Sequence, residues 1–108
     1  MIYHVTARLR EETACLFLEK LTDGSVSAQR PDGPEIVASM QRAVVLEDGC
    51  ISWTETCFCM FPLSHERKTV LDWHFADIAT AKVARHIELD GTPFMEHLRA
   101  LCAAMKTA

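Results

Sequence analysis

Residues 35–61, EIVASMQRAVVLEDGCISWTETCFCMF, decide the fold that this sequence predicts. Apolar side chains alternate along 35–46 and again along 51–61, as they do in strands that bury one face. The two runs are joined by residues 47–50, EDGC, and Asp-Gly between alternating apolar runs is a strong hairpin signal. We therefore expect two antiparallel strands connected by a tight turn.

Placing Asp48 and Gly49 at the centre of that turn determines which residues face one another. The resulting pairs are Leu46 with Ile51, Val44 with Trp53, Arg42 with Glu55, Met40 with Cys57, Ala38 with Cys59 and Ile36 with Phe61. One face of the hairpin is then apolar except for Arg42 and Glu55, whose opposite charges favour this register. A bulge at the turn would shift every pair by one residue.

The residues before the hairpin predict a strand, a helix and a long loop. Residues 2–10 alternate in polarity, which is typical of a strand with one buried face. Apolar residues then recur at helical spacing from 11 to 22, and Asp23-Gly24 ends the helix. Turn-forming residues fill 24–34, a loop longer than most and either functional or a simple insertion.

The residues after the hairpin predict a helix, a strand and a final helix. Ser64 can cap a helix that runs to about Ala81, with His74 on its apolar stripe. Residues 83–90 alternate and carry the charges that suit an edge strand. After Asp90-Gly91, a last helix begins at Pro93, a residue favoured at the first helical position.

Size and composition exclude several classes of protein. A chain of 108 residues, of which 49% are hydrophobic, is expected to form a single domain over 1–108. Its formal charge is −4 and its eleven Lys and Arg residues are scattered, which argues against nucleic-acid binding. No run reaches the roughly 18 apolar residues of a membrane helix. The first ten residues resemble a strand rather than a signal peptide, so we expect a cytoplasmic protein that contacts no membrane.

Five cysteines, an odd number, predict reduced thiols rather than a framework of disulfides. On a strand, Cys57 and Cys59 would point to the same face with Cα atoms about 6.6 Å apart, a poor geometry for a disulfide, and they would pack in the core. His65-Glu66 lacks the second histidine of an HExxH motif. We therefore expect no metal and no cofactor. The alternative is a metal site among the five histidines (His4, His65, His74, His86 and His97), or one that joins them with Cys57 and Cys59.

The predicted order strand, helix, strand, strand, helix, strand, with a helix appended, is the βαββαβ pattern of the ferredoxin-like fold. Right-handed crossovers would put the first and third strands at the centre of the sheet and both crossover helices on one face. In this element order the chain resembles the dimeric α/β-barrel superfamily. The resemblance implies an α+β domain with a four-stranded antiparallel sheet, a homodimer formed sheet to sheet, and a cavity between sheet and helices.

In that superfamily the cavity serves cofactor-free monooxygenases, isomerases, haem enzymes and stress-related proteins, but no haem-ligand or monooxygenase signature can be transferred to residues of this chain. The sheet face away from the helices would be mixed in character, with His4, Thr6 and Arg8 beside Thr54 and Thr56. We expect an identical partner to cover it, and a solvated sheet is the alternative.

The other face supplies the candidate site for a small molecule. Glu55 and His74 are the candidate catalytic residues, because a histidine beside a carboxylate can move protons. Arg42, Trp53 and Cys57 are the candidate ligand-binding residues, with Arg42 placed to hold an anionic or enolate oxygen. A thiolate of Cys57 activated by His74 is a further possibility.

The alternative is structural. Arg42 and Glu55 would then only satisfy each other near a sheet end, and His74 would be hydrogen-bonded within the core. In that case the protein is a non-catalytic homodimer or a partner-binding module. The two hypotheses differ in whether a cavity touches both Glu55 and His74.

Overall fold

The first strand and the first helix lie where the sequence predicts them. In a computed structural model that describes residues 1–107, β1 spans Ile2–Leu9 and buries every second side chain, beginning with Tyr3. A short 3-10 turn, η1 (Glu11–Thr13), leads into α1 (Ala14–Thr22). Phe17 on the inner side of α1 is fully buried. The residues that the alternating and helical patterns of the sequence place inward are therefore buried in these two elements.

The segment predicted as the first hairpin strand is mostly a helix. Helix α2 spans Gly33–Arg42, with Pro34 in its first turn, and only β2 (Val44–Val45) of this region is a strand. Ile36 and Met40, four residues apart, are both fully buried and give the helix one apolar side. The same two residues are an even number of positions apart, so they also fit the alternating pattern of a strand. The prediction of a strand over 35–46 rested on that pattern and was wrong.

The hairpin turn is present, but its register differs from the predicted one by one residue. Val45 pairs with Ile51 at the start of β3 (Ile51–Thr56), where Leu46 was expected. Gly49 has a φ of 87° and donates its N–H to the Leu46 carbonyl, so the turn holds one more residue than a two-residue turn. Arg42 and Glu55, which the predicted register placed opposite each other, therefore do not form a cross-strand pair.

A strand replaces the second half of the predicted helix 64–81. The helical segment consists of α3 (Ser64–Glu66), η2 (Arg67–Leu71) and α4 (Asp72–His74), and β4 (Phe75–Val83) follows directly. β4 pairs antiparallel with β1, with an irregularity between Thr6 and Arg8. The alanines of β4 favour a helix locally, but the hydrogen bonds offered by β1 outweigh that preference.

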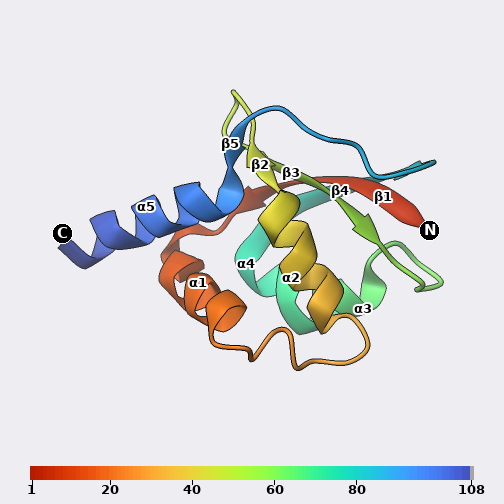
Figure 1. Cartoon of the computed structure of the whole chain (residues 1–108), viewed down its shortest axis with the longest axis horizontal. Coiled ribbons are helices and arrows are strands. Elements are labelled where there is room, and N and C mark those ends of the chain that lie inside the picture. Colours follow the sequence, from red (N-terminus) through yellow and green to blue (C-terminus); the bar gives the residue numbers. More distant parts are fainter. Residues whose placement is uncertain (108) are drawn as a thin grey trace.

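The predicted strand over 83–90 was also wrong, because β4 ends at Val83 and residues 86–90 form no regular element. This segment runs along the sheet on the side opposite the helices, where His86 contacts the hydroxyls of Thr54 and Thr56 (Figure 1). It leads to β5 (Thr92–Pro93) and to α5 (Phe94–Thr107), the final helix that the sequence predicts. The chain itself thus covers part of the face that was assigned to a partner.

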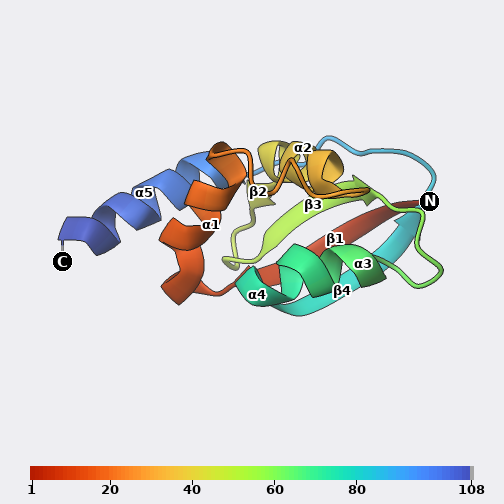
Figure 2. The ribbon, with the colours of Figure 1, turned by 90° about the horizontal axis from the view of Figure 1, so that it is seen from below.

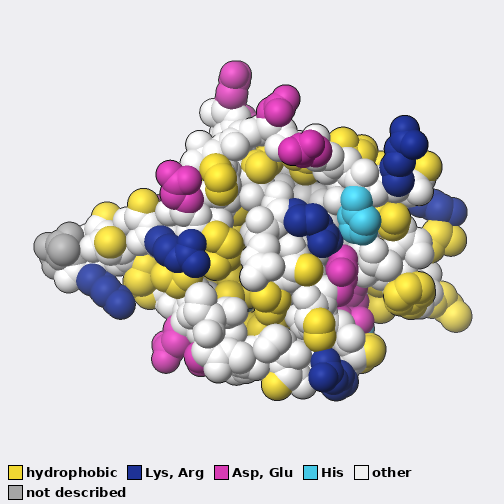
Figure 3. Space-filling model, in the orientation of Figure 1, with side chains coloured by type: hydrophobic (Ala, Val, Ile, Leu, Met, Phe, Trp, Pro, Cys, Tyr) yellow, Lys and Arg dark blue, Asp and Glu magenta, His cyan; other side chains and the backbone are white. Residues whose placement is uncertain are grey.

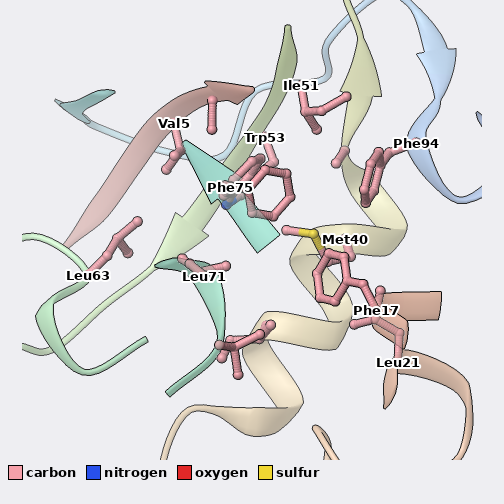
Figure 4. Packing of buried hydrophobic residues seen from close by; sticks show 14 of the residues in the cluster. Val5, Phe17, Leu21, Met40, Ile51, Trp53, Leu63, Leu71, Phe75 and Phe94 are labelled. Carbon is pink, nitrogen blue, oxygen red and sulfur yellow. The ribbon is translucent and has the colours of Figure 1, made fainter. Parts of the chain in front are cut away.

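The five strands form one antiparallel sheet in the order β4-β1-β3-β2-β5. Helices α1, α2, α3 and α4 lie on one face of it, and α5 packs beside α1 and extends away from the sheet (Figures 1 and 2). The aromatic rings of Trp53 and Phe75 meet in the core beneath these helices, with centroids 5.1 Å apart (Figure 4). The α+β class and the antiparallel sheet are confirmed, whereas the expected number of four strands was too small.

Two further features bear on the expectations from composition. Cys15 on α1 and Cys102 on α5 form a disulfide, with Cα atoms 4.9 Å apart, so the prediction that all five cysteines are reduced was wrong. The signal was absent from the sequence because the two residues are separated by 87 positions. Within the described residues, no helix is both long enough and apolar enough to span a membrane.

Candidate functional site

Arg42 does not reach Glu55 but joins α2 to the end of the sheet. Its Nη2 donates to Glu35 Oε2 over 3.0 Å and to the Thr54 carbonyl over 2.9 Å. Glu35 Oε2 also accepts the Thr56 backbone N–H over 2.8 Å. Arg42 is therefore engaged in a structural network and is not positioned to bind the anionic oxygen that the sequence suggested.

Trp53, Glu55 and Cys57 share one face of the chain at the end of β3, as predicted, and all three are buried. Trp53 Nε1 donates to Glu55 Oε1 over 2.8 Å. Burial raises the pKa of Glu55 to about 8; the Trp53 hydrogen bond opposes this rise, and the negative charges of Glu66 and Glu35 add to it. Burial likewise raises the pKa of the Cys57 thiol to about 12.

His74 is buried in another part of the core. Its ring stacks on Phe17 with centroids 4.2 Å apart, and its Nδ1 lies 2.8 Å from Thr13 Oγ1. Burial, reinforced by the charge of Lys20, lowers the pKa of His74 to about 4. A neutral ring held in this way is part of the packing between α1 and α4, so His74 does not act together with Glu55.

A cavity lies at the carboxyl end of β3, close to Glu55 but separate from His74. It has a volume of about 450 Å³ and is lined by Pro31, Asp32, Glu35, Thr56, Phe58, Cys59 and His65. These residues come from four places that meet there: the loop before α2, the first turn of α2, the end of β3 with the loop that follows it, and α3. The amino-terminal end of α2 and α3 both lie near this end of the sheet (Figure 1).

His65 and Asp32 form the polar centre of the cavity wall. His65 Nδ1 is in direct contact with Asp32 Oδ2, and both side chains are partly buried. When Asp32 accepts the proton of Nδ1, the lone pair of Nε2 is left available to a ligand or a proton donor. Gly33 next to Asp32 allows this arrangement, because a Cβ there would collide with the carbonyl oxygen of Val26.

Cys57, Cys59 and Glu66 form a second polar group beside the cavity. The Cys59 thiol donates to Glu66 Oε1 over 3.2 Å, and the Cys59 backbone N–H donates to Cys57 Sγ over 3.3 Å. Glu66 is only 1% exposed. The preceding Leu63 is buried with a φ of 56°, a left-handed conformation that is rare for such a residue and that turns the chain into α3.

The sequence singles out Cys57 and Glu55, but it considers His65 and Glu66 only for a helix start or a metal motif. Asp32 stands out only as part of a loop rich in turn formers. The contact between Asp32 and His65 spans 33 residues and crosses two elements, so no local pattern reports it. A partial signal was available in Asp32-Gly33-Pro34-Glu35, which is typical of a helix start and would have placed Asp32 at the end of α2.

The loop that follows β3 completes one side of the cavity and is unusually apolar for an exposed segment. Phe58 is 90% exposed and lines the cavity, and Met60 and Phe61 next to it are also exposed. In the space-filling view, hydrophobic side chains gather at this end of the molecule (Figure 3). An exposed aromatic ring at a cavity entrance provides apolar surface to an incoming molecule.

No family model, no curated protein and no solved structure matches this chain.

Proposed function

We propose that this protein binds a small organic molecule in the cavity at the carboxyl end of β3. The observation that carries the proposal is the His65–Asp32 pair in the wall of a space of about 450 Å³. Sites for small molecules typically occupy roughly 300–1,000 Å³ and combine apolar walls with a few polar groups. Pro31 and Phe58 supply apolar wall here, and His65 and Asp32 supply the polar groups.

The charges around the cavity restrict the ligand to neutral or cationic molecules. Asp32 and Glu35 line the cavity, and the buried Glu66 lies next to His65. Arg42, the nearest basic group to Glu35, is held by Glu35 and by the Thr54 carbonyl. Arg42 therefore balances the charge of Glu35, but Asp32 and Glu66 leave the wall with a net negative charge when His65 is neutral. This charge disfavours an anionic ligand, so we infer a mainly apolar molecule with one hydroxyl or amino group that bonds to His65 and Asp32.

The pair also suits proton transfer, since a histidine oriented by a carboxylate is a common general base. A bound hydroxyl or amino compound could therefore be transformed as well as held. Binding is the claim tested first, because it does not require the reaction to be known.

The fold-level part of the proposal is a ferredoxin-like domain related to the dimeric α/β barrels. It is supported by the order β4-β1-β3-β2 of the first four strands, with β1 and β3 adjacent. The additional strand β5 and the helix α2 in place of most of a strand depart from the simple βαββαβ pattern.

The binding proposal is tested with a panel of neutral, cationic and anionic compounds of small size, using thermal shift and then calorimetry. We expect hits among neutral or cationic compounds, and at least tenfold weaker binding by His65→Gln and by Phe58→Ala. Phe61→Ala is the matched control, because Phe61 is exposed in the same loop but does not line the cavity. Hits that bind equally well to all three variants would place the ligand elsewhere and overturn the proposal.

A non-catalytic homodimer is the second candidate function. The outer face of the sheet favours it, because Ala79 and Ala81 of β4 are exposed there and give this edge of the sheet small side chains beside Thr6 and His4 of β1. Such a surface allows two sheets to approach closely. Light scattering after size exclusion would show a mass of two chains, reduced to one by Ala79→Arg; a monomeric wild type at micromolar concentration would contradict this candidate.

A further inference from the structure

Two groups of metal-binding side chains meet at Glu66. The sulfur atoms of Cys57 and Cys59 and a Glu66 oxygen all lie within 4.8 Å of one another. Asp32, His65 and Glu66 form a second such group within the same limit. Glu66 belongs to both groups, so four other potential ligands surround one buried carboxylate.

Within the described residues, this carboxylate has an unsatisfied side. Glu66 Oε1 accepts the Cys59 thiol, whereas its Oε2 is buried without a hydrogen-bond partner. The Oε2 of Glu55 is buried without a partner as well, but its raised pKa of about 8 makes this carboxyl group neutral near pH 7, so Glu55 itself needs no cation. A buried carboxylate without a partner costs several kcal/mol by general estimates, and a positive ion would remove that cost.

The two arginines closest in sequence to Cys57, Cys59 and Glu66 do not supply that positive charge, because Arg42 is paired with Glu35 and Arg67 with Asp72. Lys68, two residues after Glu66, is exposed. Cys57 and Cys59 are free thiols, so they are not bonded to each other. The site therefore has two soft sulfur donors and a buried carboxylate, with a charge that an external cation would balance.

We propose that Cys57, Cys59 and Glu66 bind one Zn²⁺ ion, with the fourth position turned toward the cavity and filled by His65 or by a water molecule. Zinc takes two thiolates with nitrogen or oxygen ligands in tetrahedral sites, with Zn–S distances of about 2.3 Å, and the ligand atoms then lie roughly 3.5–3.8 Å apart. The observed limit of 4.8 Å for Cys57, Cys59 and Glu66 requires only a small inward movement of these three side chains. His65 meets this limit with Glu66 but not as a member of the cysteine group, so it would have to move further.

The choice of zinc follows from the donors. Thiolates select zinc over magnesium, calcium and manganese, which prefer oxygen ligands. On binding, the two thiols release their protons to solvent, and the Cys59 hydrogen bond to Glu66 is replaced by two bonds to the ion. Asp32, in contact with His65 Nδ1, would orient the ring so that Nε2 faces the ion, an arrangement common around zinc-bound histidines.

This site extends the function beyond organic-ligand binding, and its test needs no organic ligand. The protein is purified, stripped with a chelator and titrated with Zn²⁺ alone, and in parallel with Co²⁺, whose thiolate complexes absorb in the near ultraviolet. We expect one ion per chain, a Co²⁺ spectrum with thiolate charge-transfer bands, and a rise in the unfolding temperature when Zn²⁺ is added.

Matched variants assign the ligands. Cys59→Ser and Glu66→Gln are expected to weaken binding at least tenfold, and Cys59→Ser to reduce the thiolate bands. Cys50→Ser is the control, because Cys50 is a free, partly exposed thiol outside the cluster, and it should bind as the wild type does.

Folding of each variant is checked by circular dichroism. If a variant does not fold, the folded wild type is titrated in the presence of a competing chelator. That titration and the Co²⁺ bands then show whether the protein binds the ion through its thiolates. A folded wild type that binds no ion, or that binds Co²⁺ without thiolate bands, overturns the proposal. Retained zinc binding together with a failed ligand panel would leave this site standing and remove only the proposed organic ligand.

Discussion

Trp53 Nε1 donates a hydrogen bond of 2.8 Å to Glu55 Oε1, and both side chains are fully buried. The two residues are neighbours on one face of β3. Glu55 is therefore retained in the core by a specific donor, which explains how a carboxyl group can be accommodated beneath the helices.

We expect Trp53→Phe to lower the free energy of unfolding by roughly 3 kcal/mol, from lost packing and from the unpaired Glu55 oxygen. In a Glu55→Met background the same substitution should cost less, because no acceptor is left without a donor. Urea denaturation of the wild type, the two single variants and the double variant completes this double-mutant cycle. Equal costs in both backgrounds would mean that the hydrogen bond contributes nothing.

The stability of the protein is expected to fall as the pH is lowered from about 6.5 to about 4, in part because of His74. The pKa of His74 is about 4 in the folded protein and near 6.5 when unfolded, so the unfolded state takes up the proton first and is favoured in this range. His74→Gln keeps a polar side chain beside Thr13 and does not titrate. The difference in unfolding free energy between wild type and variant should therefore change between pH 6.5 and 4 and be constant above pH 7.5; a constant difference throughout would refute this assignment.

Glu35→Ala should destabilise the fold more than a typical surface substitution. Its Oε2 accepts from Arg42 and from the Thr56 N–H, which join α2 to β3, and we expect a loss of about 1–3 kcal/mol. Arg67→Ala is the control, because the Arg67–Asp72 pair is about half exposed and such pairs contribute roughly 0–1 kcal/mol. Thermal unfolding measures both variants, and similar losses would show that the Glu35 network is no more than a surface ion pair.

Cys15 and Cys102 should resist alkylation in the unfolded but unreduced protein. Mass spectrometry after iodoacetamide treatment in denaturant is expected to show three modified cysteines without reductant and five with it. Because the disulfide closes a long loop, Cys102→Ser should lower the free energy of unfolding by roughly 2–5 kcal/mol, whereas Cys50→Ser should change it little. Five modified cysteines before reduction would contradict the disulfide.

The sequence predicts correctly those elements whose apolar residues fit only one kind of secondary structure. Apolar residues alternate along β1 and recur every three or four residues along α1, so the apolar pattern alone identifies the strand and the helix. Ile36 and Met40 fit both periods, and the helix start at residues 32–35, with Pro34 in the first turn, was the signal that distinguished helix from strand. β4 was missed for another reason: its alanines carry little local information, and its strand conformation comes from pairing with β1.

Trp53, Glu55 and Cys57 lie together as the sequence predicts, whereas Arg42 and His74 do not join them. Trp53, Glu55 and Cys57 follow from alternation along a single strand, which a sequence reports reliably. Arg42 was matched to Glu55 as part of a hairpin strand, but it ends α2, and the longer turn also shifts the register of the remaining strand by one residue. His65 and Asp32 meet only because α3 and the start of α2 fold against the same end of β3, a tertiary relationship that no single segment encodes.

The central claim is that the carboxyl end of β3, and not the region around His74, is where this protein meets small molecules. Two-dimensional ¹H–¹⁵N spectra recorded during titration with a hit from the ligand panel test this most directly. The account predicts shifts concentrated at Asp32, Phe58, Cys59 and His65, with the amides around His74 unchanged. Shifts centred on His74, or spread evenly over the chain, would contradict it.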